Sequence, residues 1–170
     1  MTSDSHNSKR APMLGCIADD VTGATDLALN LAQGGMRVVQ SLGAPSASEL
    51  NRVDADAVVI ALKTRSISAD DAIASSLAGV KALRNVGVAR YFFKYCSTFD
   101  STPSGNIGPV AEALLAELDV SHTIFCPAFP RNGRTVYQGH LFVNGRLLHE
   151  SAMESHPLNP MSDPNLVRHL

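Results

Sequence analysis

The chain has 170 residues, enough for one domain with its own hydrophobic core, and its 45% hydrophobic and 18% charged residues are ordinary for a soluble globular protein. The net charge of −2 at pH 7 gives no basic excess of the kind that favours nucleic acid or an anionic membrane as a partner. No apolar run approaches the roughly 20 residues of a membrane span, and the polar N-terminus lacks the apolar core of a signal peptide. The three cysteines are odd in number and far apart, which fits a reducing cytoplasm better than a disulfide framework or a zinc site.

Short apolar runs alternate with helical patterns between residues 13 and 126. Apolar residues recur with helical spacing after the first, third and fourth runs, which predicts three amphipathic helices. Ser68 with Asp71 resembles a capping box at the second helix, and Asn106 is expected to cap the third. The apolar runs that predict buried strands are residues 13–18, 36–42, 57–62, 90–95 and 122–126.

This alternation predicts an α/β fold, with a mainly parallel open sheet and helices on both of its faces. After Pro130 the pattern changes, and the Asn144-Gly145 turn between two apolar–polar runs predicts a β-hairpin. Asp163-Pro164 is typical of an N-cap followed by proline at the first helical position. We therefore expect a disordered tail over residues 1–12, one α/β domain over 13–155, and the start of a linker over 156–170.

Hydrogen-bonding residues gather where the predicted strands end. The stretch "YFFKYCSTFDST" shows this best, because an apolar strand leads directly into hydroxyls and a carboxylate. In an open α/β sheet, ligands bind outside the carboxyl ends of the strands. Lysine and arginine pair with carboxylate or phosphate, whereas aspartate accepts hydrogen bonds from sugar hydroxyls. The sequence therefore predicts a site for a small, anionic, polyhydroxylated molecule.

The stretch "ADDVTGA" carries two adjacent carboxylates and is compatible with more than one kind of site. The adjacent carboxylates Asp19 and Asp20 could hold Mg²⁺ as in receiver domains, but the end of the third strand reads "ALKTRS" and lacks the acceptor aspartate. Haloacid-dehalogenase-type phosphatases need an Asp-x-Asp spacing, which is absent. The simplest role for Asp20 or Thr22 is to cap the first helix, and this role is compatible with ligand binding. No metal-ligand spacing and no phosphate-loop motif is present, so no metal site is predicted.

Four ordered blocks resemble the four-carbon acid sugar kinase family: "IADDVTGATDLA", "ALKTRS", "FFKYCSTFDSTPSGNIGPV" and "CPAFPRNGRTVYQGHLFVNG". The resemblance covers nearly all of the chain from Met13 to Leu170 and is strongest to the 3-oxo-tetronate 4-kinase branch. The threonate and erythronate branches tend to continue as Leu-Arg-Gly-Asn, where this chain continues as "PSGN".

The resemblance implies an N-terminal domain that binds the acid sugar and a C-terminal domain that binds ATP and Mg²⁺. It implies phosphoryl transfer to the 4-hydroxyl of 3-oxo-tetronate, with this chain supplying only the acid-sugar part and inactive alone. Asp19 and Asp20 would face substrate hydroxyls, and Arg65 and Lys94 would meet the carboxylate. Asp20 is the candidate general base, although the base could equally lie in the C-terminal domain. The remaining residues carried over to the pocket are Ser97, Thr98, Asp100, Ser101, Asn132, Gly133 and Arg134.

Two other functions stay open on the sequence. The chain could be a sugar-acid-binding module without catalysis, or a structural domain that forms a homodimer through the hairpin, since paired strands offer edges. Neither nucleic acid nor a membrane is an expected partner.

Overall fold

A computed structural model describes residues 10–170, so the predicted tail over residues 1–12 lies mostly outside the described residues. The main sheet is parallel and has the strand order β2-β3-β1-β4, which confirms the predicted α/β class. Its two central strands carry the most buried side chains, as expected where both faces of a sheet are covered. The strands are β1 (Leu14–Ala18), β2 (Val38–Leu42), β3 (Ala57–Ala61) and β4 (Tyr91–Lys94).

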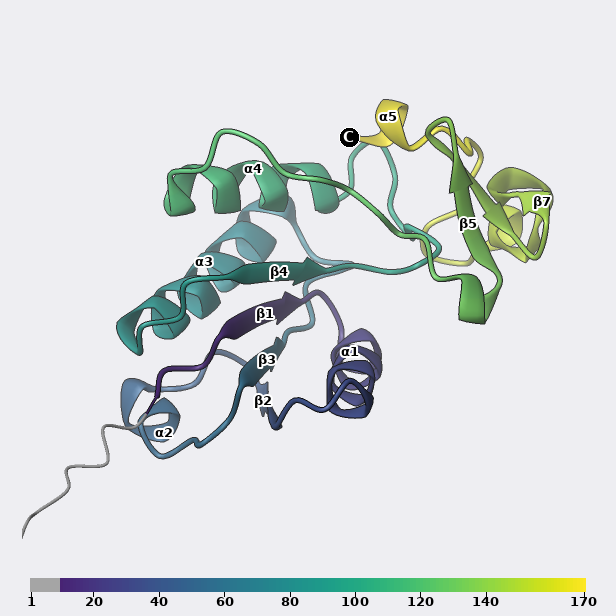
Figure 1. Cartoon of the computed structure of the whole chain (residues 1–170). Coiled ribbons are helices and arrows are strands. Elements are labelled where there is room, and N and C mark those ends of the chain that lie inside the picture. The colour runs from purple at the N-terminus through teal and green to yellow at the C-terminus, as the bar shows by residue number, and fades with distance from the viewer. Residues whose placement is uncertain (1–9) are drawn as a thin grey trace, which may run out of the picture.

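Helices cover both faces of this sheet (Figure 1). On one face, α1 (Val21–Gln33) packs its small and apolar residues against alternate residues of β1 and β3. On the other face, α3 (Ala69–Asn85) and α4 (Ile107–Leu118) pack against the intervening residues of the same strands, such as Ile17 of β1 and Ile60 of β3. The short α2 (Ala47–Leu50) begins at a capping box on Ser46. Within residues 10–170, no helix combines the length and apolar character needed to cross a membrane.

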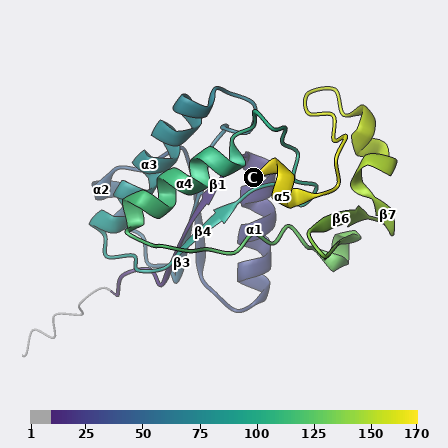
Figure 2. The same cartoon turned by 90° about the horizontal axis from the view of Figure 1, so that it is seen from above.

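A second, antiparallel sheet lies beyond the carboxyl ends of the main strands, as Figures 1 and 2 both show. The predicted turn at Asn144-Gly145 is confirmed, but the sequence-based prediction had one hairpin where the chain forms two. The additional turn is Gln138-Gly139, where both residues have positive φ like the pair at 144–145. The elements are β5 (Arg134–Tyr137), β6 (His140–Val143) and β7 (Arg146–Leu147), flanked by 3₁₀ turns at Pro130–Asn132, Leu148–Glu150 and Ala152–Ser155.

Residues 156–170 pack back onto this small sheet. The N–H of Leu141 donates to the carbonyl of Pro164 at 2.9 Å, and Met161 is fully buried. The predicted helix cap at Asp163 is wrong, because the side chain of Asn165 caps the last helix, α5 (Leu166–His169). Asp163 instead accepts hydrogen bonds from the guanidinium of Arg168. The expectation that this segment leads into a linker stays a prediction.

The fifth predicted strand, residues 122–126, is wrong. These residues have no regular structure and most of them are exposed. A strand forms only where a neighbouring backbone pairs with it. Here the N–H of Cys126 donates to the Tyr95 hydroxyl at 2.8 Å, and within residues 10–170 no strand pairs with residues 122–126.

Candidate functional site

Three strands end together at one edge of the main sheet. Ala18 of β1 pairs in register with Ala61 of β3 and with Lys94 of β4. The N–H groups of Thr64 and Arg65 then donate to the carbonyl of Asp19, at 2.9 and 3.3 Å. This register brings the residues that follow each strand to one place, which we call the rim and define as Asp19, Asp20, Arg65, Lys94 and Asp100.

Arg65 is the centre of the rim and contacts three carboxylates. Its Nε and Nη2 donate to the two oxygens of Asp19, at 3.0 and 2.7 Å. Nη2 also lies 2.9 Å from Oδ1 of Asp20, and Nη1 lies 3.3 Å from Oδ2 of Asp100. The guanidinium that was predicted to meet a substrate carboxylate is therefore already engaged by side chains of the chain itself.

The charges of this cluster perturb one another. Burial raises the pKa of Asp19, while hydrogen bonds from Arg65 and its positive charge oppose that rise. Burial lowers the pKa of Arg65, but the carboxylates outweigh burial and raise it further above its usual value. Three carboxylates around one guanidinium leave an excess of hydrogen-bond acceptors at the rim.

Asp20 is both a helix cap and a member of the rim. Its Oδ1 accepts from the N–H of Gly23 at 2.7 Å, as a capping residue does, and also faces Arg65. Its side chain is 28% exposed, compared with 6% for Asp19 and 9% for Asp100. Asp20 is therefore the carboxylate of the rim that a ligand reaches most easily.

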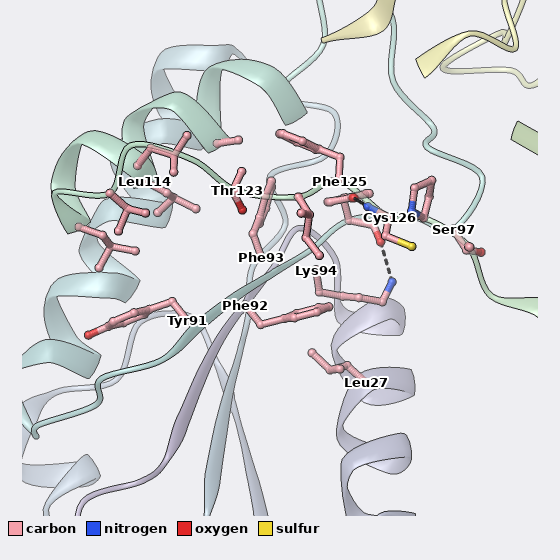
Figure 3. A pocket seen from close by; sticks show the side chains of 18 of the residues that line it. Leu27, Tyr91, Phe92, Phe93, Lys94, Ser97, Leu114, Thr123, Phe125 and Cys126 are labelled. Carbon is pink, nitrogen blue, oxygen red and sulfur yellow. Dashed lines mark hydrogen bonds between the residues drawn. The ribbon is translucent and has the colours of Figure 1, made fainter. Parts of the chain in front are cut away.

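Lys94 is the cation of the rim that has no carboxylate partner among residues 10–170. Its ammonium donates to the carbonyl of Tyr95 at 2.6 Å (Figure 3). A Cβ built on Gly23 would lie 3.4 Å from Nζ, so the ammonium lies over the first turn of α1. It retains donors for an anionic ligand.

The loop after β4, which carries the other predicted residues, contains two consecutive residues of positive φ. Phe99 and Asp100 have φ values of 63° and 50°, which side chains other than glycine rarely adopt. Thr98, Asp100 and Ser101 are all buried. Such strain persists where surrounding contacts over-determine it and is common at ligand sites.

Asn106 supports the rim in a way that the sequence did not indicate. It occupies the N-cap position of α4, but its side chain makes no capping bond. Instead Nδ2 donates to the carbonyls of Thr64 and Ile67, at 2.6 and 3.0 Å, and more weakly to that of Arg65. The predicted cap is thus a tether for the loop that carries Arg65.

Two further residues at the rim were missed. Nδ2 of Asn159 donates to Oδ1 and to the carbonyl of Asp100, at 3.1 and 3.2 Å, and His156 places Nδ1 3.5 Å from the same Oδ1. The only sequence signal was a histidine and an asparagine within "HPLNP". They close the rim from the side of the small sheet.

The Asn-Gly-Arg stretch lies apart from this cluster. Asn132, Gly133 and Arg134 belong to the 3₁₀ turn and β5, and no hydrogen bond or ion pair within residues 10–170 joins them to the rim. Arg134 donates to the carbonyl of Asn132. Gly133 fits against Asn144, since a Cβ at 133 would lie 2.1 Å from its Oδ1.

A cavity of about 620 Å³ adjoins the rim and differs from it in character. It lies between the outer edge of β4, α4 and residues 120–129, and its walls are mostly aromatic and aliphatic (Figure 3). Lys94 and Ser97 are shared between its lining and the predicted site. The apolar walls suit no polyhydroxylated ligand, so we place the candidate site at the rim rather than in this cavity.

The rim does not fit a resident metal ion. Its carboxylates converge on Arg65, and residues 10–170 contain no group of histidine, cysteine, aspartate or glutamate arranged to hold a metal. Nothing at the rim resembles a phosphate-binding loop followed by a helix.

Comparison with known proteins identifies relatives over almost the whole chain. Residues 14–170 match the family model described as a sugar-binding N-terminal domain. The chain is 62% identical to a 3-oxo-tetronate kinase of Pseudomonas savastanoi over 157 residues, 92% of this chain and 37% of that protein. It is 54% identical to the 3-oxo-tetronate kinase of Salmonella typhimurium, covering 91% of this chain and 36% of that protein.

Solved structures share the fold. A protein from Salmonella typhimurium LT2, described as a putative tRNA synthase, has a TM-score of 0.88 at 53% identity and covers 94% of this chain and 38% of its own. A domain of unknown function from Bordetella bronchiseptica, a domain swapped dimer with bound citrate, has a TM-score of 0.76 at 31% identity, over 92% and 40% of the two chains. The chain therefore spans well under half the length of its relatives.

Proposed function

The chain belongs to the family of sugar-binding N-terminal domains, and from this premise we propose that it is the acid-sugar-binding part of an ATP-dependent 3-oxo-tetronate kinase. The observation that carries the proposal is the rim itself, where Asp20 and Lys94 are accessible beside the buried Asp19–Arg65 pair. Relatives named as kinases at 54–62% identity support the same reaction class.

In this proposal each group of the rim has a separate task. Lys94 binds the carboxylate of the four-carbon acid, because its ammonium has no carboxylate partner within the described residues. Asp20 accepts hydrogen bonds from the sugar hydroxyls and is the candidate base for the 4-hydroxyl. Arg65 and Asp19 hold the geometry. We expect the pocket to be lined by four residues that follow β4: Ser97, Thr98, Asp100 and Ser101. Asn132, Gly133 and Arg134 make no hydrogen bond or ion pair with the rim within residues 10–170, so we expect them at its outer border at most.

ATP and Mg²⁺ are assigned to the part of the relatives that this chain does not span. Phosphoryl transfer depends on positioning and on neutralising phosphate charge. In this proposal the rim positions the acceptor, and residues 10–170 hold no cluster of histidine, cysteine, aspartate or glutamate for a metal ion that would neutralise phosphate charge. We expect the chain alone to bind the acid sugar and to turn over no ATP.

Isothermal titration calorimetry tests the proposal. Titration with 3-oxo-tetronate, L-threonate and citrate should release or absorb heat in the wild-type chain, and Lys94→Met should weaken binding about tenfold or more, because a charge-assisted hydrogen bond is lost. Lys81→Met on the exposed side of α3 is the matched control and should bind normally. A folded wild-type chain that binds none of the three would contradict the proposal.

Self-association is a separate part of the proposal, supported by the domain swapped dimer of the Bordetella bronchiseptica neighbour. Light scattering after size exclusion should give twice the chain mass of 18.0 kDa. A monomer across the accessible concentration range would exclude the homodimer and leave the ligand site untouched.

A further inference from the structure

The segment 156–159 is fixed to the rim through one carboxylate. Oδ1 of Asp100 accepts from Asn159 at 3.1 Å, and Oδ2 of Asp100 faces Nη1 of Arg65 at 3.3 Å. The carbonyl of Asp100 accepts a second bond from Asn159 at 3.2 Å. Asp100 thus joins the loop after β3 to Asn159, which follows Asp100 by 59 residues in the chain.

The same segment determines which nitrogen of His156 carries the proton. The backbone N–H of Asn159 donates to Nδ1 of His156 at 3.1 Å, so Nδ1 acts as an acceptor. A neutral imidazole whose Nδ1 accepts carries its proton on Nε2. The 3.5 Å between Nδ1 and Oδ1 of Asp100 exceeds the usual hydrogen-bond range of about 2.7–3.2 Å, so the N–H of Asn159 is the nearer partner of Nδ1.

Within residues 10–170, no acceptor bonds to the Nε2–H group of His156. Nε2 is also absent from the buried polar atoms that lack a hydrogen bond in this part of the chain. The side chain is 29% exposed, and because Nε2 is not among these buried unpaired atoms, solvent reaches this donor. Its tautomer is fixed by backbone, and its position is fixed through Asn159 and Asp100. A donor held in this way is preorganised for a ligand.

The rim lacks donors of this kind. Its three carboxylates are acceptors and suit ligand hydroxyls, whereas an oxo or carboxylate oxygen requires a donor. The N–H donors of Arg65 face the carboxylates of the rim, including both oxygens of Asp19. Lys94 donates one hydrogen bond to the carbonyl of Tyr95. His156, whose Nδ1 lies 3.5 Å from Oδ1 of Asp100, adds an uncharged donor next to this carboxylate.

We propose that His156 contacts the bound four-carbon acid by donating Nε2–H to an acceptor oxygen of its oxo or carboxylate group, with Asn159 as the positioning residue. This inference rests on the proposed function of the rim. It assigns a ligand contact to residues 156–159, which the sequence interpretation had placed at the start of a linker.

Two substitutions of His156 test the roles of its two ring nitrogens separately. His156→Asn keeps an acceptor near Nδ1 and removes the donor at Nε2, and calorimetry with 3-oxo-tetronate and L-threonate should show binding weakened roughly tenfold or more. His156→Gln carries an amide N–H to the neighbourhood of Nε2 and should stay within about threefold of wild type. His122→Gln is the matched control, since His122 is exposed and bonds only to Ser121 among the described residues.

The possible results are distinguishable. If His156→Asn binds like wild type while Lys94→Met loses affinity, the inference is wrong and the proposed function stands. If both His156 variants lose affinity equally, with unchanged thermal midpoints, the Nε2 donor is not the contact and the inference is likewise wrong. If the wild-type chain binds no four-carbon acid, both fall.

A further test uses the wild-type chain alone and does not depend on the folding of a variant. Long-range ¹H–¹⁵N NMR spectra of the imidazole should show the Nε2–H tautomer in the free chain, and its Nε2 signal should shift on titration with L-threonate. The Nδ1–H tautomer, or an Nε2 signal unmoved at saturating ligand, would overturn the inference.

Discussion

The guanidinium of Arg65 holds both carboxylate oxygens of Asp19, through Nε at 3.0 Å and Nη2 at 2.7 Å. The two residues are 46 positions apart and meet because β1 and β3 are neighbours in register. A two-point contact of this kind fixes orientation as well as distance. It makes this pair the frame on which the more accessible Asp20 and Lys94 are arranged.

Arg65→Gln should raise the pKa of Asp19 further, because burial then acts without the opposing cation. A folded-state pKa above the unfolded value means that the folded chain binds the proton more tightly. The contribution of Asp19 to stability therefore decreases as the pH rises from the unfolded pKa through the folded one, and the variant should widen that interval. Carboxyl ¹³C NMR measures the titration directly. An Asp19 pKa that falls in the variant would contradict this account.

The contribution of the Arg37–Asp56 pair to folding stability is expected to have the opposite pH dependence. Hydrogen bonds from the Arg37 side chain and backbone lower the pKa of Asp56 to about 2. The stabilisation is present above the unfolded pKa near 3.8 and is lost as the pH falls toward 2. Urea unfolding at pH 5 and pH 2.5 should show a smaller loss of stability in Arg37→Ala than in wild type. An equal loss in both chains would show that Asp56 has no such role.

Asn106 offers a test between capping and tethering. Aspartate caps a helix about as well as asparagine, so a capping role predicts that Asn106→Asp is tolerated. The observed side chain donates to carbonyls, and a carboxylate cannot donate. We expect Asn106→Asp to destabilise the fold by about 1–3 kcal/mol, at least as much as Asn106→Ala, since it also places a charge against carbonyl oxygens. Denaturant unfolding of the two variants decides, and an unaffected Asn106→Asp would favour capping.

Gly133 and Gly145 form a matched pair for the small sheet. Both have positive φ, at 72° and 79°, so alanine costs roughly 1–2 kcal/mol at either position. At Gly133 the new Cβ would also lie 2.1 Å from Oδ1 of Asn144, whereas nothing lies within 4 Å at Gly145. Gly133→Ala should therefore lower the thermal midpoint more than Gly145→Ala. Equal shifts would show that the contact with Asn144 relaxes without cost.

The parts of this structure that follow from local patterns were predictable. Apolar runs such as "AVVIAL" indicated buried strands, and a parallel sheet places the ends of such strands at one edge, which located Asp19, Arg65 and Lys94. Contacts that depend on distant pairing were not predictable. Residues 122–126 have a strand-like composition but pair with no strand among residues 10–170, and His156 reaches Asp100 only because the small sheet folds back. The engagement of Arg65 by three carboxylates was likewise invisible, because charge type alone does not show which partner an arginine takes.

The most direct test of the account is an amide ¹H–¹⁵N NMR titration of the wild-type chain with 3-oxo-tetronate, using L-threonate as a stable analogue. If the ligand binds at the rim, amide signals should shift with ligand concentration at residues 19–23, 64–66, 94–101 and 156–159. These segments come from separate elements and meet at one edge of the sheet. Shifts confined to the aromatic wall of the apolar cavity around Phe92 and Ile124, with the rim unmoved, would contradict it.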